Sequence, residues 1–189
     1  MDGYGFYIFL GLIALTLVWA VRTYNSLILS RQRVEEGWSG IDVQLRRRSN
    51  LIPNLVETVK AFASHEEGTL TKVTELRRQS AAAETSGDTA KRAAAEGQMS
   101  GALMHLFAVA ENYPDLKANQ NFLDLQNDLS EIEEEIQLSR RYYNGAARQL
   151  NVAVESVPSN IIANFFKFEK ATYFEMPEED RAVPNVSFS

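Results

Sequence analysis

The feature that most constrains this chain is a stretch of 18 residues without a charged side chain, Tyr4 to Val21. As an α-helix rising about 1.5 Å per residue, this stretch is about 27 Å long, close to the ~30 Å hydrocarbon thickness of a bilayer. Aromatic residues stand at both ends, Tyr4, Phe6 and Tyr7 at one and Trp19 and Tyr24 at the other, as they do at membrane–water interfaces. The stretch therefore predicts a membrane-spanning helix. Its candidate anchor residues are Tyr4, Phe9, Leu12, Leu15 and Trp19.

A cleaved signal peptide would instead carry basic residues before the apolar stretch and a small-x-small cleavage site after it. Asp2 precedes the stretch and no such site follows it, so we expect a retained anchor, with a buried core helix as the main alternative. No Lys or Arg precedes the stretch, whereas Arg22, Arg31 and Arg33 follow it closely. The positive-inside rule then places the N-terminus outside and the rest of the chain in the cytoplasm.

The composition excludes several classes of function. The chain of 189 residues has 19 basic and 25 acidic side chains, two histidines and no cysteine. Without cysteine it forms no disulfide framework, thiolate nucleophile or iron–sulfur cluster. An acidic balance argues against a nucleic-acid groove. We expect no cofactor, no metal and no nucleic-acid partner.

Beyond the anchor, apolar residues recur at the alternating four- and three-residue steps of a helical stripe. Ten of 13 positions are apolar in the first stripe and ten of 11 in the second. The first stripe is Val34, Trp38, Ile41, Leu45, Arg48, Ile52, Leu55, Val59, Phe62, Glu66, Thr69, Val73 and Leu76. The second is Phe122, Leu125, Leu129, Ile132, Ile136, Ser139, Tyr143, Ala146, Leu150, Ala153 and Val157. An alanine-rich third pattern, from Thr89 to Asn112, has Met99, Leu103, Leu106 and Ala110 on one face.

Turn residues divide these patterns. The sequence Thr85-Ser-Gly-Asp88 predicts a turn in which Asp88 caps the next helix, and Tyr113-Pro114 closes that helix. The ambiguous point is Pro53. We favour a break near Ser49 with Asn50 as N-cap, because Pro53 then falls in the first turn, where its missing N–H costs nothing. The alternative is an unbroken, kinked helix, and the stripe that runs through Pro53 supports it.

These patterns predict an all-α protein with an N-terminal transmembrane helix followed by an antiparallel, up-and-down four-helix bundle. We place the anchor at residues 1–22, the bundle at 23–157, and a short aromatic helix with an extended tail at 158–189.

Two groups of residues are candidates for contact with a partner or another subunit. The first surrounds the proposed turn, where structural support is the favoured role because buried polar groups need partners; it contains Trp38, Asp42, Asn50 and Pro53. The second is aromatic and either caps the open end of the bundle, which we favour, or lies on the membrane or a neighbouring subunit. It contains Phe165, Phe166, Phe168, Tyr173 and Phe174.

Other charged motifs point to structure rather than to a catalytic site. His65-Glu66-Glu67 lacks the second histidine that a zinc-protease helix needs four residues on, since Thr69 stands there. The acidic run Glu131 to Glu135 is expected to be a solvated helix face. Arg46, Arg47 and Arg48 are expected to pair with acids such as Glu57 or to cap helix ends.

The sequence resembles the LemA family of bacterial membrane proteins over nearly its whole length. The resemblance is carried by Tyr24-Asn25 and Arg31, by Ile41 to Lys60 with His65-Glu66, by Tyr142-Tyr143-Asn144, and by Glu155 to Asn160 followed by the aromatic residues up to Glu175. Asn50 and Ala61 stand where the family often has Asp and Gly. The resemblance implies a helical cytoplasmic bundle on a single span of the bacterial inner membrane, with no established enzymatic activity.

We expect a non-enzymatic scaffold that binds the bilayer, self-associates and recruits other membrane proteins; narrow stripes and small residues such as Gly11, Ala93, Gly97 and Gly101 favour close helix contact. The alternative is a sensory or adaptor protein that presents its bundle or residues 177–189 to a membrane protease or kinase. A hydrolytic enzyme is the weakest hypothesis, because no nucleophile, base and orienting residue stand at recognisable spacing.

Overall fold

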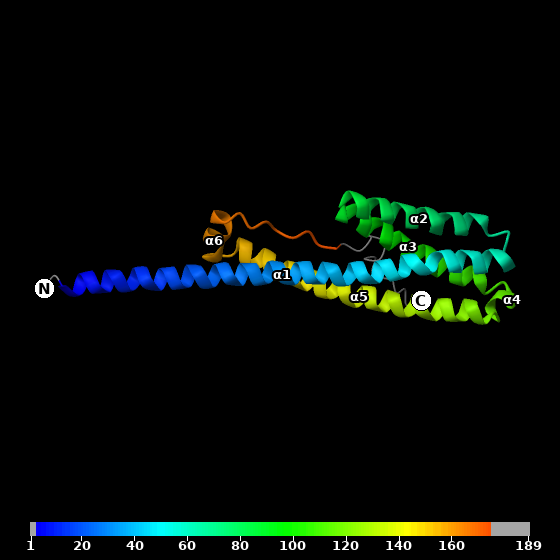
Figure 1. Cartoon of the computed structure of the whole chain (residues 1–189), viewed down its shortest axis with the longest axis horizontal. Helices are drawn as coiled ribbons and strands as arrows, with labels where there is room; N and C mark the ends of the chain where they lie inside the picture. Colours follow the sequence, from blue (N-terminus) through cyan, green and yellow to red (C-terminus); the bar gives the residue numbers. More distant parts are fainter. Residues whose placement is uncertain (1–2, 175–189) are drawn as a thin grey trace, which may run out of the picture. The chain divides into compact units, whose positions relative to one another are not determined.

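In a computed structural model, which describes residues 3–174, every regular element is an α-helix (Figure 1). The helices are α1 (Gly3–Phe62), α2 (Glu67–Ser86), α3 (Thr89–Ala110), α4 (Pro114–Lys117), α5 (Gln120–Glu155) and α6 (Ser159–Phe165). The all-helical class predicted from the sequence is confirmed for these residues.

The described residues fall into two compact units. The N-terminal unit combines the residues up to Ser39 with Ser139–Tyr173, and the central unit contains Gly40–Leu138. The long helices α1 and α5 each contribute one segment to each unit.

The apolar stretch lies in α1, within the N-terminal unit. By length and composition, α1 is the one described helix that is apolar enough to cross a membrane, and no residue in its most apolar window is buried inside the protein. The five candidate anchor residues lie on this segment, four of them exposed and Trp19 half-buried. Contact between water and so long a segment of apolar side chains is energetically unfavourable.

The central unit is built around one apolar core shared by four long helical segments and the short helix α4. The residues of the two stripes and of the alanine-rich pattern meet there, as their spacing predicts. The core contains Ile52, Leu55 and Val59 from α1, Leu70, Val73 and Leu76 from α2, Met99, Leu103 and Leu106 from α3, Leu116 from α4, and Phe122 and Leu129 from α5.

The turn between α2 and α3 forms as predicted. Gly87 takes a left-handed conformation with φ of 68°, which glycine adopts without steric cost, and its N–H bonds back to the last turn of α2. The Asp88 side chain accepts a hydrogen bond from the Lys91 backbone N–H at 3.0 Å, so it caps α3.

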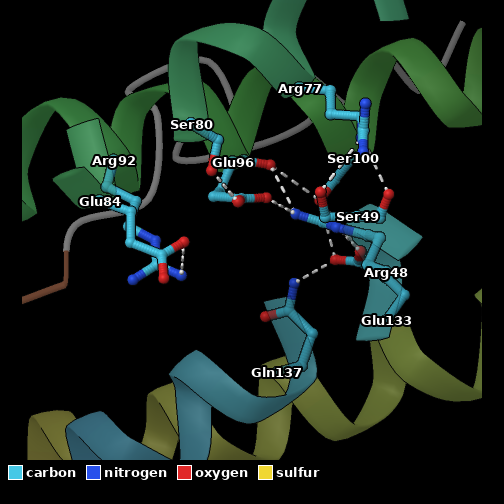
Figure 2. Close-up of polar contacts among 10 residues, drawn as sticks. All are labelled: Arg48, Ser49, Arg77, Ser80, Glu84, Arg92, Glu96, Ser100, Glu133 and Gln137. Atoms are coloured by element: carbon cyan, nitrogen blue, oxygen red, sulfur yellow. Dashed lines mark hydrogen bonds and ion pairs between the residues drawn. The ribbon is translucent and has the colours of Figure 1, made fainter. Parts of the chain in front are cut away.

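The predicted break near Ser49 is wrong, because α1 runs without interruption through Pro53 to Phe62. Proline cannot donate to the carbonyl four residues earlier, which here is that of Ser49. The Nε of Arg77, on α2, donates to that carbonyl oxygen at 3.0 Å (Figure 2). A neighbouring helix therefore satisfies the group that proline leaves unbonded, and Asn50 lies inside the helix as an exposed residue rather than as its cap.

The chain turns instead at residues 63–66, where the sequence predicts a continuous helix. Glu66 and Thr69 are two of the three polar positions in the first apolar stripe, so the stripe weakens at this turn. The Tyr113 hydroxyl donates to the Glu66 carboxylate at 2.9 Å and fixes the turn to the segment that follows α3.

The N-terminal unit has a smaller core, centred on Leu27 of α1, Leu150 of α5 and Ala163 of α6. Its helices α1 and α5 approach closely at Gly37, where an added Cβ would lie 3.0 Å from the Cα of Tyr143. The rings of Trp38 and Tyr143 meet edge to face beside this point, 5.7 Å apart.

The segment that follows α6 is held by one asparagine. The Asn151 side-chain amide donates to the Ala171 carbonyl at 2.9 Å and accepts from the Ala171 N–H at 2.8 Å. The Tyr143 hydroxyl donates to the carbonyl of Thr172 at 2.7 Å. A segment without regular structure is thus paired to α5 through its backbone.

Candidate functional site

The most prominent polar feature of the central unit is a buried cluster around Arg48, in which the guanidinium lies between the carboxylates of Glu96 and Glu133 (Figure 2). Its Nη2 is 2.5 Å from Glu96 Oε2 and also donates to the Glu96 backbone carbonyl at 3.1 Å. Arg48 is 1% exposed and Glu96 4% exposed, so the pair is removed from water.

Hydroxyl and amide groups complete the cluster. Ser80 of α2 donates to Glu96, and Ser100 of α3 accepts from Arg48 at 2.9 Å and lies 3.0 Å from Glu133. Gln137 donates to Glu133 at 3.2 Å. The cluster therefore joins α1, α2, α3 and α5 around one guanidinium.

A second ionic cluster surrounds Arg92, which is 5% exposed. Its guanidinium contacts Asp42 at 2.6 Å and Glu84 at 3.4 Å. Arg46 reaches the same two carboxylates, at 3.0 Å and 2.8 Å. Two arginines and two carboxylates thus balance in charge and connect α1, α2 and α3.

These two clusters are better suited to holding the helices in position than to binding a ligand. A buried ion pair has one favourable arrangement, since desolvated charges that lose their partners are costly. The carboxylates face arginines and hydroxyls of the chain itself. Among residues 3–174, no three His, Cys, Asp or Glu side chains are grouped as metal ligands would be.

The prediction that the arginines pair with acidic residues is confirmed for Arg46 and Arg48. The partner named in that prediction, Glu57, is wrong, because Glu57 is exposed and takes no part in these pairs. The acidic run Glu131 to Glu135 is largely a solvated face, as expected, except that Glu133 turns into the Arg48 cluster.

Sequence reasoning missed Arg92, Glu96, Ser80 and Arg77, although two of these positions carried a signal. Arg48 stands in the first apolar stripe, and the stripe of the alanine-rich helix extends backward from Met99 to Glu96 and Arg92. A charge at a core position predicts a buried partner. Which helix supplies that partner depends on packing that the stripe does not specify.

Among the residues predicted to surround the turn, Asp42 joins the Arg92 cluster and Trp38 packs on Tyr143. Asn50 and Pro53 are exposed. Asn50 lines a shallow pocket together with Arg47, Leu51, Asp128, Glu131 and Ile132. The structure therefore separates these four residues and does not assemble them into one site.

The aromatic group belongs mainly to the N-terminal unit. Phe166 and Phe168 pack on Tyr24 of α1, with ring centroids 4.6 Å and 5.8 Å apart, and the Arg31 guanidinium lies 5.6 Å from the Phe168 ring. Phe165 is 78% exposed, and Tyr173 is also exposed. Phe174 is buried. The extended tail predicted for residues 178–189 lies outside the described residues.

Three titratable groups show where hydrogen bonds and burial act. Burial raises the pKa of the Tyr143 hydroxyl. The hydrogen bond to the Glu66 carboxylate raises the pKa of Tyr113. On the exposed face of α2, hydrogen bonds from Arg78 and then Gln79 lower the pKa of Glu75 to about 2.

Comparison with known proteins gives a consistent set of relatives. The model of the LemA family matches residues 37–188. The chain is 28% identical to Magnetosome protein MamQ 2 of Paramagnetospirillum magneticum, over 85% of this chain and 68% of that protein. It is 24% identical to Magnetosome protein MamQ of Magnetospirillum gryphiswaldense with the same coverage. It is 25% identical to Protein LemA of Metamycoplasma hominis, over 86% of this chain and 74% of that protein.

Proposed function

This chain belongs to the LemA family, and on that premise we propose that it is a non-enzymatic, membrane-anchored scaffold that self-associates and organises or recruits other membrane components. The proposal places it in a bacterial inner membrane as a single-pass protein with its helical part in the cytoplasm. It includes an antiparallel, up-and-down arrangement of the four helical segments in the central unit, which short connections favour.

The observation that carries the proposal is that one helix bears both the anchor and part of the bundle core. The exposed apolar stretch and the buried residues Ile52, Leu55 and Val59 all lie on α1. A charged cluster that joins four helical segments gives the bundle one defined arrangement. Two relatives are named as magnetosome proteins, which supports a membrane-associated role.

Self-association is supported by Gly11, in the middle of the apolar stretch. A Cβ added there would meet nothing within 4 Å, so this face of α1 is open to a second helix. In lipid, small residues allow two helix backbones to approach closely.

The test is native mass spectrometry of the full-length protein released from lipid nanodiscs and from detergent. We expect oligomers, and Gly11→Ile is expected to lower the oligomeric fraction about tenfold, whereas Leu12→Ile leaves it unchanged. A protein that stays monomeric at high concentration in both environments contradicts the scaffold.

Orientation is tested in the same protein, which has no native cysteine. A single cysteine at the exposed position Asn50 is expected to react with a membrane-impermeant maleimide only after spheroplasts are lysed. Reaction in intact spheroplasts contradicts a cytoplasmic bundle.

A second candidate, an adaptor, is favoured by a groove of about 560 Å³ between α1 and α5 in the central unit. Three carboxylates and no basic residue line it, and Phe62 and Leu125 form its apolar part. Its chemistry fits a basic amphipathic helix, such as the Lys- and Arg-rich cytoplasmic end of another membrane-spanning segment. The groove lining is Asn54, Glu57, Thr58, Ala61, Phe62, Asn119, Asn121, Asp124, Leu125 and Asp128.

Matched charge reversals on α5 test the adaptor. Asp124→Lys with Asp128→Lys changes the groove, whereas Glu134→Lys with Glu135→Lys makes the same change of charge on exposed residues outside it. The adaptor predicts that membrane proteins cross-linked to the wild type are lost only with the first pair. Equal loss with both pairs indicates nonspecific electrostatic binding. Deletion of residues 177–189 tests the tail in the same assay.

A further inference from the structure

The short helix α6 of the N-terminal unit is apolar on both its inner and its outer side. Ala163 is fully buried against Leu27 and Leu150. On the outer side, Ile161 is 61% and Phe165 78% exposed, and residues four apart lie on the same face of a helix. Ser159, Asn160 and Asn164 of α6 are polar, so its exposed apolar side chains are those of Ile161 and Phe165.

Exposed apolar side chains continue on both sides of α6. Val157, just before it, is 80% exposed, and Phe166, just after it, is 50% exposed. These residues and the outer face of α6 form one surface, which we name the α6 surface: Val157, Ile161, Phe165 and Phe166. The rings of Phe165 and Phe166 lie 5.0 Å apart, and exposed apolar side chains grouped in this way mark sites of contact with a protein or a membrane.

The contacts of Tyr24 place the α6 surface close to the end of the uncharged stretch. Tyr24 touches both Phe166 and Phe168, and it follows the last residue of the uncharged stretch, Val21, by three residues. Three residues of helix span about 4.5 Å. The interfacial layer on each side of the hydrocarbon core is of the same order, and helices that lie in it bury their apolar face by about 5–10 Å.

Figure 1 shows α6 beside α1. Within the segment of residues 139–173, α6 is the part that lies nearest the N-terminal stretch of α1. Basic side chains stand close in the sequence to the α6 surface and to Tyr24, and Glu155, two residues before Val157, is paired with Lys170 at 2.8 Å. Lys167 is exposed directly after Phe166, and Arg22 is exposed two residues before Tyr24. Cations at this level meet lipid phosphates.

We infer that the α6 surface is a second membrane contact. Ile161, Phe165 and their neighbours enter the interfacial layer of the bilayer leaflet from which α1 emerges after Val21. The inference depends on the anchored topology proposed above. Apolar burial supplies most of the binding, since α6 itself carries no charged residue. The contact fixes residues 157–168 to the lipid surface beside α1, so the N-terminal unit binds the membrane at two places.

The test uses nitroxide labels on single cysteines in the full-length protein in nanodiscs of neutral and anionic phosphatidyl lipids. Electron paramagnetic resonance compares relaxation by oxygen, which concentrates in lipid, with relaxation by a water-soluble nickel chelate. Labels at Ile161 and Phe165 are expected to favour oxygen at least severalfold. The control label replaces Met104, an apolar residue of the central unit that is 70% exposed, and is expected to favour nickel.

A label at Leu12 in the same series separates the two proposals. If Leu12 reports lipid while Ile161 and Phe165 match Met104, the α6 contact is wrong and the anchor stands. If Leu12 also reports water, the anchored topology itself fails. If labels at Ile161 and Phe165 are protected from both reagents and broaden each other between protomers, a second copy covers the surface, and the inference is overturned.

A paired substitution adds a second measurement. Because both side chains are exposed, Ile161→Glu with Phe165→Glu is expected to leave the thermal unfolding of the detergent-solubilised protein within about 2 °C of the wild type. In nanodiscs the same pair is expected to shift a label at Asn164 from oxygen to nickel. An unchanged Asn164 signal overturns the contact.

Discussion

The two units depart from the usual distribution of side chains in different ways. The central unit buries Arg48, Arg92 and Glu96, each 5% exposed or less, whereas the N-terminal unit buries Arg140 and leaves long apolar segments exposed. In the central unit, groups of the protein replace water around the charges, because arginines and hydroxyls meet carboxylates. In the N-terminal unit, the exposed apolar side chains are not covered by the described residues and need apolar surroundings outside the protein. The buried charges therefore restrict how the chain folds, whereas the exposed apolar side chains restrict the surroundings in which it is stable.

The largest expected effect tests the buried charge. Arg48→Met keeps most of the side-chain volume but leaves Glu96 buried without its cation, so we expect the free energy of unfolding of the central unit to fall by about 3–5 kcal/mol. Hydrogen exchange of α2 and α3 during urea unfolding measures this, since both helices lie wholly in that unit.

The matched control is Arg47→Met, one residue along the same helix and exposed, which is expected to change stability by less than about 0.5 kcal/mol. If the two variants lose equal stability, the cluster is not what holds the central unit.

The next effect belongs to the N-terminal unit. Asn151→Ala removes both hydrogen bonds to Ala171 and leaves its backbone groups unpaired, at a cost of about 2–3 kcal/mol. We expect faster hydrogen exchange and proteolysis at residues 168–174, with α2 and α3 unaffected. Gln149→Ala, exposed on the same helix, is the control. Spread of the effect to α2 would show that the two units unfold together.

A double-mutant cycle tests how α1 accommodates its proline. Arg77→Ala leaves the Ser49 carbonyl without its donor and is expected to cost about 1–2 kcal/mol. In a Pro53→Ala background the new N–H bonds to that carbonyl, so the cost of Arg77→Ala is expected to fall by about half or more. Additive effects in urea unfolding would refute the compensation.

A stabilising change is expected after α6. Lys167 has a φ of 56° in a Schellman motif, where the N–H of Phe168 bonds to the Ala163 carbonyl at 2.9 Å. Lys167→Gly relieves the left-handed conformation and is expected to add about 1 kcal/mol. Lys167→Ala, which keeps the Cβ, is not expected to stabilise. Equal thermal midpoints for Gly and Ala would contradict this account.

The smallest effect concerns pH. Burial raises the pKa of Tyr143, so its neutral form stabilises the folded N-terminal unit. That contribution is complete below the ordinary tyrosine pKa of about 10 and is lost as the pH rises through the higher folded value. Unfolding between about pH 9 and 12 is expected to show a steeper loss of stability in the wild type than in Tyr143→Phe, and identical slopes would exclude Tyr143 as the group responsible.

The all-helical class and the core positions follow from the sequence because apolar spacing reports directly on which residues share a helix face. The core residues Ile52, Leu55, Val73 and Leu76 were all identified in this way. The turn at Gly87 and Asp88 was equally predictable, since its chemistry is local.

The continuity of α1 was not predictable from local chemistry. Pro53 reads as a break until Arg77, 28 residues from Ser49, is known to lie beside the freed carbonyl. The acid partners of Arg48 depend in the same way on contacts distant in the sequence, 48 residues to Glu96 and 85 to Glu133. For the aromatic segment around α6, the sequence predicts either a cap on the bundle or a contact with the membrane or a neighbouring subunit, because it does not specify which element covers this segment.

The close approach at Gly37 has its own consequence. Because glycine has only a hydrogen atom in place of a side chain, α1 and α5 can approach this closely, and Gly37 therefore sets the distance between them. A methyl group would force the neighbours apart by a few tenths of an ångström, and close-packed interiors transmit such displacements instead of absorbing them. The edge-to-face rings of Trp38 and Tyr143 lie next to this position, so the widening is expected to change their contact first.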